Sequence, residues 1–508
     1  MKRVIFVLIL LMLCVVCTAA QAEKDGLYIY EINEDNTVTI TGYDWANNHG
    51  DIYIPEMLGN RLVSAIGDNA FATRDNEPVS ITLPDGIRSI GELAFRGVAI
   101  KYINIPLNTT VIGGGAFAEC SVMQFRVASG HQVFATIENA LYNKQTKTLI
   151  AWPTNKEISE IPNGIVEIGD YVFYGRNIDL TYRVTVVDIE SKPFIPDSLT
   201  TIGRYAFAEG SFEGSLNNVS VIKDYAFFTV KENRNHFNHN SYYMESKILI
   251  TSQLHLSIIG SHAFENQNVI LYPPEYKKDD WYCMLSDTPY EIGEYAFHNT
   301  YFPSYQTKHC RLSLMNLTSI GKYAFAIDIE NIRIVPGNEY TIEPKTVEIQ
   351  EGDFRSLRFI GECAFGERIP WISYVILDCR ELKSVGTSAF ECNYHNHFDD
   401  DGVKSVTIGS SVTIIADKAF KGCELLESLT LSEGLETIGS EAFMNCKKLA
   451  EISIPASVTY IGNNVFDNCS DKLVITVEAG SYGEIWARTC GYAYKVNGQE
   501  DDTSWLTN

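Results

Sequence analysis

The sequence predicts a solenoid, a chain wound into stacked coils of short parallel strands and tight turns. The first observation is a six-residue motif, I-G-x-x-A-F, that recurs fourteen times with small variations. The second is its period, which is 23 residues from Ile415 to Ile438 and again from Ile438 to Ile461. Because each coil packs only on its neighbours, a chain of 508 residues needs no single globular core. The fourteen copies begin at Ile66, Ile90, Ile112, Ile168, Ile202, Ile222, Ile259, Ile292, Ile320, Ile360, Val385, Ile415, Ile438 and Ile461.

Each repeat contains two extended segments joined by turns. In one repeat, residues 426–431 alternate apolar and polar side chains, which is typical of a half-buried strand. Stacked repeats would pair these strands in a parallel sheet about 4.8 Å apart. A proline often follows the strand, as Pro455 does, and it predicts a turn because it cannot extend a ladder. The second extended segment ends at the motif isoleucine.

The motif predicts the turn that carries the chain back. We expect its glycine to adopt a backbone conformation that other residues resist. Its alanine is small where the coil is tight, and its phenylalanine is the large buried anchor. The fourteen anchors are Phe71, Phe95, Phe117, Phe173, Phe207, Phe227, Phe264, Phe297, Phe325, Phe365, Phe390, Phe420, Phe443 and Phe466.

Four cysteines keep the same period, because Cys120, Cys423, Cys446 and Cys469 each lie three residues after a motif phenylalanine. This register predicts a structural role for their thiols, not catalysis or metal binding. Six other cysteines lie outside it: Cys283, Cys310, Cys363, Cys379, Cys392 and Cys490. An exported protein could pair some of these in disulfides, and their connectivity stays open.

These features resemble the BspA-like, or Treponema-type, leucine-rich repeat family. The resemblance rests on I-G-x-x-A-F, on the cysteine three residues later and on the L-x-x-I-x-I-P strand, and it spans roughly residues 52–477. It implies a curved, right-handed leucine-rich-repeat solenoid of about 15 coils, mostly short parallel β-strands and turns with little helix. By the same resemblance, residues 23–51 are an N-terminal hairpin cap, residues 478–496 a C-terminal cap, and residues 497–508 a flexible tail.

The middle of the array is irregular. The steps between motifs lengthen there, which predicts enlarged loops at about residues 120–165 and 228–358 of the solenoid. Within the first of these, residues 139–153 alternate in a way that predicts a hairpin. Insertions in a solenoid project as loops from one face, so they are favoured positions for function.

The N-terminus predicts a secretory signal peptide over residues 1–22. Lys2 and Arg3 precede an apolar run over residues 4–16, and Ala20 and Ala22 provide a small-residue cleavage site. Cys17 follows Val16, whereas a lipoprotein signal requires a small residue before its cysteine. We therefore expect a secreted or cell-surface protein with no transmembrane segment after the signal is removed.

The chain is strongly acidic, with a formal net charge of −24. The signal peptide contributes two basic residues and no acidic ones, so its removal leaves −26. Such a charge argues against nucleic acid and against an anionic membrane surface as partners. It suits an exported protein, or one that meets basic surfaces.

Aromatic residues in the irregular middle are the first candidates for partner binding. Exposed tyrosine and tryptophan are common anchors of protein interfaces and of sugar-binding platforms. The alternative is that they pack the insertions onto the solenoid. The candidates are Tyr242, Tyr243, Tyr272, Tyr276, Trp281, Tyr282, Tyr301 and Tyr305.

A second candidate is a stripe of rings at the position before the motif alanine or valine. Six successive repeats carry Tyr171, Tyr205, Tyr225, His262, Tyr295 and Tyr323 there. Elsewhere the position accepts Lys, Glu and Asn, which predicts that it lies near solvent. The alternative is that the rings stack on one another and cover the edge of the core.

Metal binding and catalysis have weak support. His236 with His239, and His395 with His397, lack zinc spacing, and the acidic run 399–401 lacks the spaced ligands of a calcium loop. No nucleophile elbow, zinc-protease motif, phosphate loop or dinucleotide fingerprint is present. We therefore expect no catalytic residue, no cofactor and no metal.

Members of the resembling family are mostly cell-surface or secreted proteins, and some act in adhesion. The resemblance thus implies an exported, non-catalytic interaction protein that binds a protein partner, such as a host matrix protein or another cell surface, through an extended repeat surface. Two alternatives stay open. One is a carbohydrate-binding module that uses the aromatic insertions, and the other is a self-assembling envelope scaffold.

Overall fold

The computed structural model describes residues 22–498 except 49, 74–76, 157, 159, 180–194, 211, 217, 231–246, 252–254, 268, 273–280, 285, 287, 301–309, 315, 327–346, 350–355, 367–373 and 393–401. The chain divides into two compact units between residues 157 and 158, and each is described by itself. Both are built mostly from short strands and turns. The predicted leucine-rich repeat fold with little helix is confirmed, whereas the handedness and the number of coils stay predictions. No helix among the described residues is long and apolar enough to cross a membrane.

Unit 1 contains two series of parallel strands behind an antiparallel start. β1, β2 and β3 are antiparallel, and β3 then pairs in parallel with the series β6, β8 and β10. The second series is β4, β7, β9 and β11, also parallel. The bounds are β1 Glu23–Asp25, β2 Tyr28–Ile32, β3 Val38–Tyr43, η1 Trp45–Asn47, β4 Ile52–Tyr53, β5 Met57–Leu58, β6 Arg61–Ile66, β7 Val79–Thr82, β8 Ser89–Ile90, β9 Ile100–Ile105, β10 Val111–Ile112 and β11 Gln124–Val127.

Three antiparallel strands close unit 1: β12 (Phe134–Ile137), β13 (Ala140–Asn143) and β14 (Thr148–Ala151). β13 and β14 form a hairpin in the segment where the alternation predicts one. Just before β12, the buried His131 accepts hydrogen bonds at Nδ1 from the backbone N–H groups of Val133 and Phe134, both at 3.1 Å. Burial lowers the pKa of His131, so the neutral ring is the form that fits.

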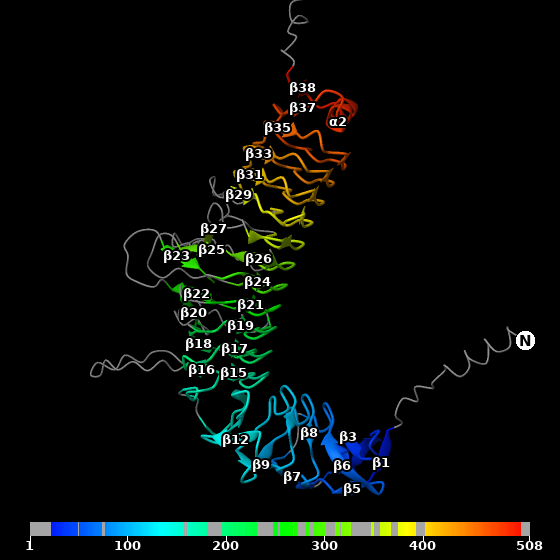
Figure 1. Cartoon of the computed structure of the whole chain (residues 1–508), viewed down its shortest axis with the longest axis vertical. Helices are drawn as coiled ribbons and strands as arrows, with labels where there is room; N and C mark the ends of the chain where they lie inside the picture. Colours follow the sequence, from blue (N-terminus) through cyan, green and yellow to red (C-terminus); the bar gives the residue numbers. More distant parts are fainter. Residues whose placement is uncertain are drawn as a thin grey trace, which may run out of the picture. The chain divides into compact units, whose positions relative to one another are not determined.

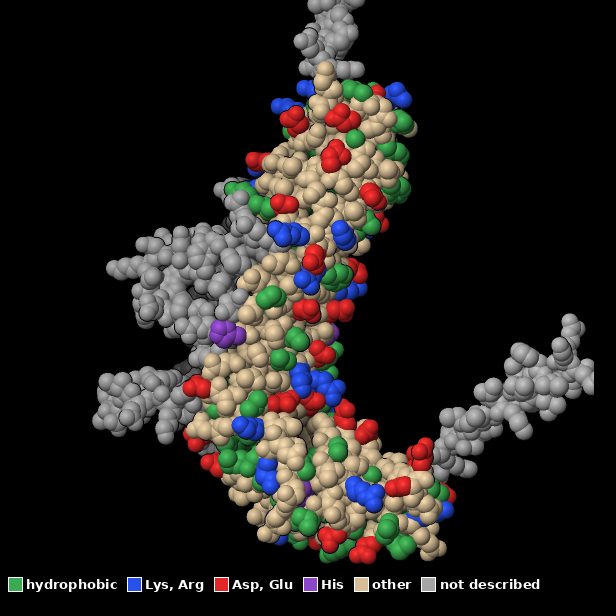
Figure 2. Space-filling model, viewed as in Figure 1, with side chains coloured by type: hydrophobic (Ala, Val, Ile, Leu, Met, Phe, Trp, Pro, Cys, Tyr) green, Lys and Arg blue, Asp and Glu red, His purple; other side chains and the backbone are tan. Residues whose placement is uncertain are grey.

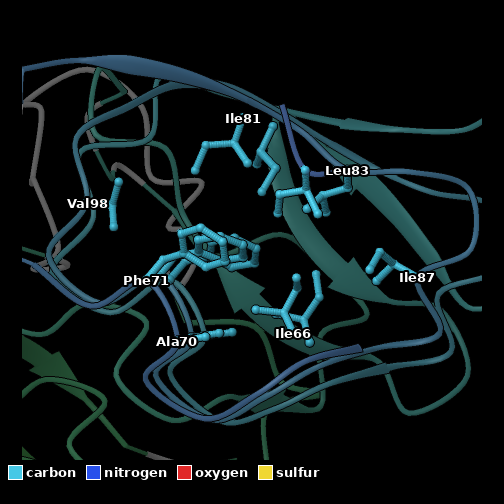
Figure 3. Close-up of a cluster of buried hydrophobic side chains, with 14 of the residues drawn as sticks. Ile66, Ala70, Phe71, Ile81, Leu83, Ile87 and Val98 are labelled. Carbon is cyan, nitrogen blue, oxygen red and sulfur yellow. The ribbon is translucent and has the colours of Figure 1, made fainter. Parts of the chain in front are cut away.

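The core of unit 1 lies between its two strand series. Figure 3 shows Ile66 and Ile87 pointing inward from one side, and Ile81 and Leu83 from the other, around the motif ring of Phe71. The rings of Phe71 and Phe95 stack at 5.3 Å, and all the labelled side chains are buried. The alternating apolar and polar pattern of these strands therefore places their apolar side chains in this core.

Unit 2 repeats the same coil, with two stacks of strands that Figure 1 shows side by side. The shorter strands end at the motif isoleucine or valine: β15 Glu167–Ile168, β17 Thr201–Ile202, β19 Val221–Ile222, β21 Ile258–Ile259, β24 Tyr290–Ile292, β26 Leu317–Ile320, β28 Phe359–Ile360, β30 Ser384–Val385, β32 Ile414–Ile415, β34 Thr437–Ile438 and β36 Tyr460–Ile461. The other stack holds β16 Ile178–Asp179, β18 Phe212–Ser215, β20 Lys247–Thr251, β22 Val269–Tyr272, β23 Trp281–Met284, β25 Cys310–Ser313, β27 Val347–Ile349, β29 Tyr374–Leu377, β31 Ser405–Ile408, β33 Ser428–Leu431, β35 Glu451–Ile454, β37 Val474–Val477 and β38 Tyr494–Val496. Neighbouring strands within each sheet of the two stacks are parallel, with β15, β17, β19, β21, β24, β26 and β28 in one continuous series.

The motif turn has the same backbone conformation in every repeat. The residue before the motif alanine or valine has a φ between 51° and 62° in all fourteen copies, which is the left-handed region. Only one of these residues, Gly115, is a glycine. An L-residue in this conformation costs roughly 1–2 kcal/mol, so the stacked coils impose it against local preference.

Lys418→Gly is therefore expected to stabilise unit 2 by about 1 kcal/mol, since Lys418 has a φ of 59° and glycine accepts that conformation without strain. The greater freedom of glycine in the unfolded chain limits the gain. Urea unfolding followed by circular dichroism measures it. Lys418→Ala is the control and should give no gain, and equal midpoints for the two variants would contradict the strain argument.

The expectation for the motif glycines is wrong. None of them lies in the left-handed region. Their role is to let neighbouring coils approach closely. A Cβ built at Gly439 would lie 2.4 Å from the backbone nitrogen of Asp417 in the preceding coil, and a Cβ at Gly462 would lie equally close to the backbone nitrogen of Ser440. Two repeats carry Lys223 and Ala416 at this position in place of glycine.

The motif phenylalanines form a column through each unit. All fourteen are buried, and in unit 2 successive rings stack at 5.0–5.8 Å from Phe173 to Phe466. Each of the four in-register cysteines donates its thiol hydrogen to the carbonyl of the phenylalanine one repeat earlier, for example Cys469 to Phe443 at 3.2 Å. Thr300 makes the same bond to Phe264 at 2.7 Å, so a hydroxyl replaces the thiol in that repeat.

The α-helix that the structure describes, α2 (Tyr482–Cys490), covers the end of the phenylalanine column in unit 2. Sequence reasoning did not foresee this helix. The Ser481 hydroxyl accepts from the N–H of Glu484 at 3.2 Å, and Gly491 ends the helix in the left-handed conformation with a φ of 79°. The S-x-x-E spacing and the following glycine are the signals that could have identified it.

Candidate functional site

The side chains of the eight aromatic residues that the sequence singles out lie outside what the structure describes. Tyr242, Tyr243, Tyr276, Tyr301 and Tyr305 lie outside the described residues. Tyr272 ends β22, and Trp281 and Tyr282 begin β23, but their side chains also fall outside the description. The histidines at 236, 239, 395 and 397 and the acidic run 399–401 lie outside it as well. The roles considered for these residues therefore stay predictions.

The second candidate, the stripe of rings, is an ordered ladder in unit 2. We call the six rings Tyr171, Tyr205, Tyr225, His262, Tyr295 and Tyr323 the ladder. Their successive centroids are 4.8, 4.6, 4.4, 4.8 and 5.0 Å apart, with interplanar angles of 4–16°. Five such steps make the ladder about 24 Å long.

The left-handed turn is the reason for the stacking. Each ring stands on a residue with the same φ, so each side chain leaves its coil in the same direction. The coils repeat at the spacing of strands in a sheet, about 4.8 Å, which is also a favourable distance between stacked rings. The register of the coils therefore becomes the register of the ladder.

The ladder is half-buried along its length. Partial burial raises the pKa of Tyr205, Tyr225 and Tyr295, so their phenols keep their protons. At one end Tyr323 donates to the sulfur of Cys363, which raises the pKa of that phenol. The rings do stack and cover the core edge, as the packing alternative expects, and each of them also keeps a part exposed to solvent.

A carboxylate bridges two histidines at the centre of the ladder. Glu265 Oε2 is 2.5 Å from Nδ1 of His262, and Glu265 Oε1 is 2.8 Å from Nδ1 of His298. Burial alone would raise the pKa of Glu265, but the hydrogen bonds from the two histidines outweigh it and lower that pKa. An ionised carboxylate only accepts, so both Nδ1 atoms donate.

Sequence reasoning missed Glu265 and His298. They follow the motif phenylalanine directly, a position that carries Tyr174 and Phe228 in other ladder repeats. Those rings contact the ladder too: Tyr174 is 5.8 Å from Tyr171, and Phe228 is 5.4 Å from Tyr225. Aligning the repeats at this second position was the available signal.

The ladder offers ring edges, phenol groups and a bridged carboxylate for contact with a partner. Among the described residues, no three potential metal ligands lie close enough to hold an ion. Three register thiols are unreactive, because burial raises the pKa of Cys120 to about 12 and that of Cys423 and Cys446 well above the ordinary value. The fourth differs, since a hydrogen bond with Cys446 lowers the pKa of the Cys469 thiol. Cys120, Cys363, Cys423, Cys446, Cys469 and Cys490 carry free thiols.

Glu265→Gln is expected to destabilise unit 2 by about 1–3 kcal/mol at pH 7, because two charge-assisted hydrogen bonds are weakened. The folded pKa of Glu265 lies below its unfolded value, so the unfolded chain takes up more protons on acidification. The stabilisation is thus present above about pH 4.5 and is lost as the pH falls through the folded pKa. Urea midpoints of variant and wild type should converge in acid. Glu291→Gln, at an exposed carboxylate, is the control, and a gap that stayed constant with pH would count against the bridge.

A family model described as BspA type Leucine rich repeat region (6 copies) matches this chain over residues 64–194, 154–272, 290–399 and 393–482. The chain is similar to a solved leucine rich cell surface protein from Faecalibacterium prausnitzii, at 17% identity over 96% of this chain and 97% of that one, with a TM-score of 0.28. It is similar to a leucine-rich repeat protein from Bacteroides ovatus, at 17% identity over 93% and 99%, with a TM-score of 0.29. It is also similar to the pneumococcal vaccine antigen PcpA, at 12% identity over 94% and 99%, with a TM-score of 0.20. No curated protein matches the chain.

Proposed function

The chain belongs to the BspA-type leucine-rich repeat family, and on that premise we propose that it is an exported, non-catalytic protein that binds a protein partner. Its mechanism is multi-point docking on the repeat surface, as an adhesin docks on a host matrix protein or on another cell. The ladder is the observation that carries this proposal, because it presents one continuous aromatic edge across six consecutive repeats. The signal peptide that the sequence predicts over residues 1–22 supports export.

Stacking argues against a sugar platform at the ladder. A sugar ring binds on the open face of an aromatic ring, but here neighbouring rings 4.4–5.0 Å apart cover the faces between them. Because those faces are covered and each residue is partly exposed, the inner rings offer solvent their edges. Edges and phenol groups suit hydrogen bonds with a protein surface.

The test is binding of the protein from Glu23 onward to arrays of matrix proteins and glycans, at low and at physiological salt. We expect protein hits that weaken with salt, because the acidic charge steers the encounter. A ladder variant, Tyr205→Leu with Tyr225→Leu, should lose those hits, whereas exposed Tyr460→Leu should keep them. Leucine occupies the same left-handed position at Leu93, so the ladder exchange is compatible with the turn. Glycan hits alone, or silence on both arrays, would refute the proposal.

A further inference from the structure

We infer that the part of the ladder from Tyr225 to Tyr323 takes a lysine- and arginine-rich segment of the partner protein. The inference rests on the proposed function and specifies the chemistry of the partner. Its basis is the charge that surrounds the rings, combined with the partial exposure of the rings themselves.

Three described cations beside the ladder already have an anionic partner. Arg204 pairs with Asp170 at 3.0 Å, Lys322 with Glu362 at 2.7 Å, and Lys223 with Glu167 at 2.6 Å. Figure 2 shows the same interspersion of acidic and basic side chains on the visible face. These three basic charges are therefore neutralised within the protein.

Two carboxylates in the centre are left over. Asp224 directly precedes Tyr225, and Glu294 directly precedes Tyr295; both are exposed, and neither forms an ion pair with any residue that the structure describes. Asp224 accepts only the backbone N–H of Ser261, at 2.7 Å. Burial is the main cause of the raised pKa of Tyr225 and of Tyr295, and the charges of Asp224 and Glu294 add to it. The centre of the ladder thus combines unneutralised negative charge with aromatic edges.

This combination fits basic side chains. A guanidinium offers five donors in a plane, enough to bond a carboxylate and a phenol oxygen together, and the stems of arginine and lysine can cover ring edges. An extended peptide rises about 3.3 Å per residue, so about four residues span the part from Tyr225 to Tyr323 and about seven span the whole ladder. An acidic segment would be repelled by Asp224 and Glu294.

The test is fluorescence anisotropy with two labelled probes, an alternating arginine–lysine heptapeptide and an oligoglutamate heptapeptide, at physiological salt. Against the basic probe, Asp224→Asn with Glu294→Gln is expected to raise Kd about tenfold. The matched control is Asp417→Asn with Glu436→Gln, because Asp417 accepts the N–H of Ser440 at 2.7 Å as Asp224 accepts that of Ser261. The control removes the same charge from exposed sites outside the ladder and should change Kd less than about twofold.

Equal losses in the two double variants would overturn the inference, because the peptide would then respond only to total charge. Preference for the acidic probe, or no loss in the ladder variant, would overturn it too. Circular dichroism of both variants establishes that they are folded. These outcomes can be distinguished from a failure of the proposed function. If binding to a protein on the array survives the Asp224 and Glu294 changes, the interaction role stands and only the basic partner is refuted. If no protein on the array binds, the interaction role itself is refuted.

Discussion

Phe420→Ala is expected to destabilise unit 2 by about 3–5 kcal/mol. The Phe420 ring is fully buried and lies between Phe390 at 5.1 Å and Phe443 at 5.5 Å, parallel to each within 1°. Its removal loses the transfer free energy of a large side chain and leaves a cavity that the backbone hydrogen bonds between coils keep from collapsing. Because the column is continuous, the two neighbouring rings each lose a stacking face.

Hydrogen exchange measured by mass spectrometry is the appropriate readout, since a repeat array need not unfold in one step. Protection should fall most in the coils that hold Phe390, Phe420 and Phe443, and less in distant coils of unit 2. Phe359→Ala is the matched control, because that ring is 53% exposed on the outer face of β28 and should change stability by less than about 0.5 kcal/mol. Equal effects of the two substitutions would mean that the column does not hold the coils together.

The column illustrates what the sequence could predict. The phenylalanine at a fixed register, the alternating strand and the cysteine three residues later recur from coil to coil. The sequence of a single coil is enough to show which of its side chains point inward. The interactions between neighbouring coils were harder to foresee. The bond from Cys469 to the Phe443 carbonyl joins two repeats, and Thr300 makes the same bond with a different residue type.

The candidate site shows the same limit more clearly. The ladder position could be found because its rings occur at one register, but its left-handed backbone could not, since thirteen of its fourteen residues disfavour that conformation in isolation. Glu265 is a common residue at a variable position, and it became part of the site only when stacking brought His262 and His298 to its two oxygens. The prediction for the motif glycines was wrong because a glycine can be required for two different reasons. Glycine signals either a rare φ or close approach, and only the neighbouring coil distinguishes the two.

The closed C-terminal end of the array follows from the same physics as its interior. A column of rings has two ends, and an end ring would present its apolar face to water. In unit 2 the last ring, Phe466, meets Trp486 of α2 at 6.1 Å and Tyr492 at 6.3 Å, both nearly perpendicular to it. Edge-to-face contact of this kind ends a stack without offering another parallel face for growth.

Trp486→Ala is therefore expected to cost about 3–5 kcal/mol and to loosen the last coils before the rest of unit 2. Trp486 is 9% exposed and also stacks on Tyr492 at 5.1 Å, so its loss uncovers Phe466 and frees the segment that carries β38. Ile485→Ala on the same helix is the control, because Ile485 is 51% exposed and its removal leaves the cap in place. Hydrogen exchange should rise first around β37 and α2 in Trp486→Ala and stay unchanged in Ile485→Ala. If exchange rose evenly through unit 2 instead, the coils would unfold as one cooperative body, and the helix would be a part of that body and not a cap on its end.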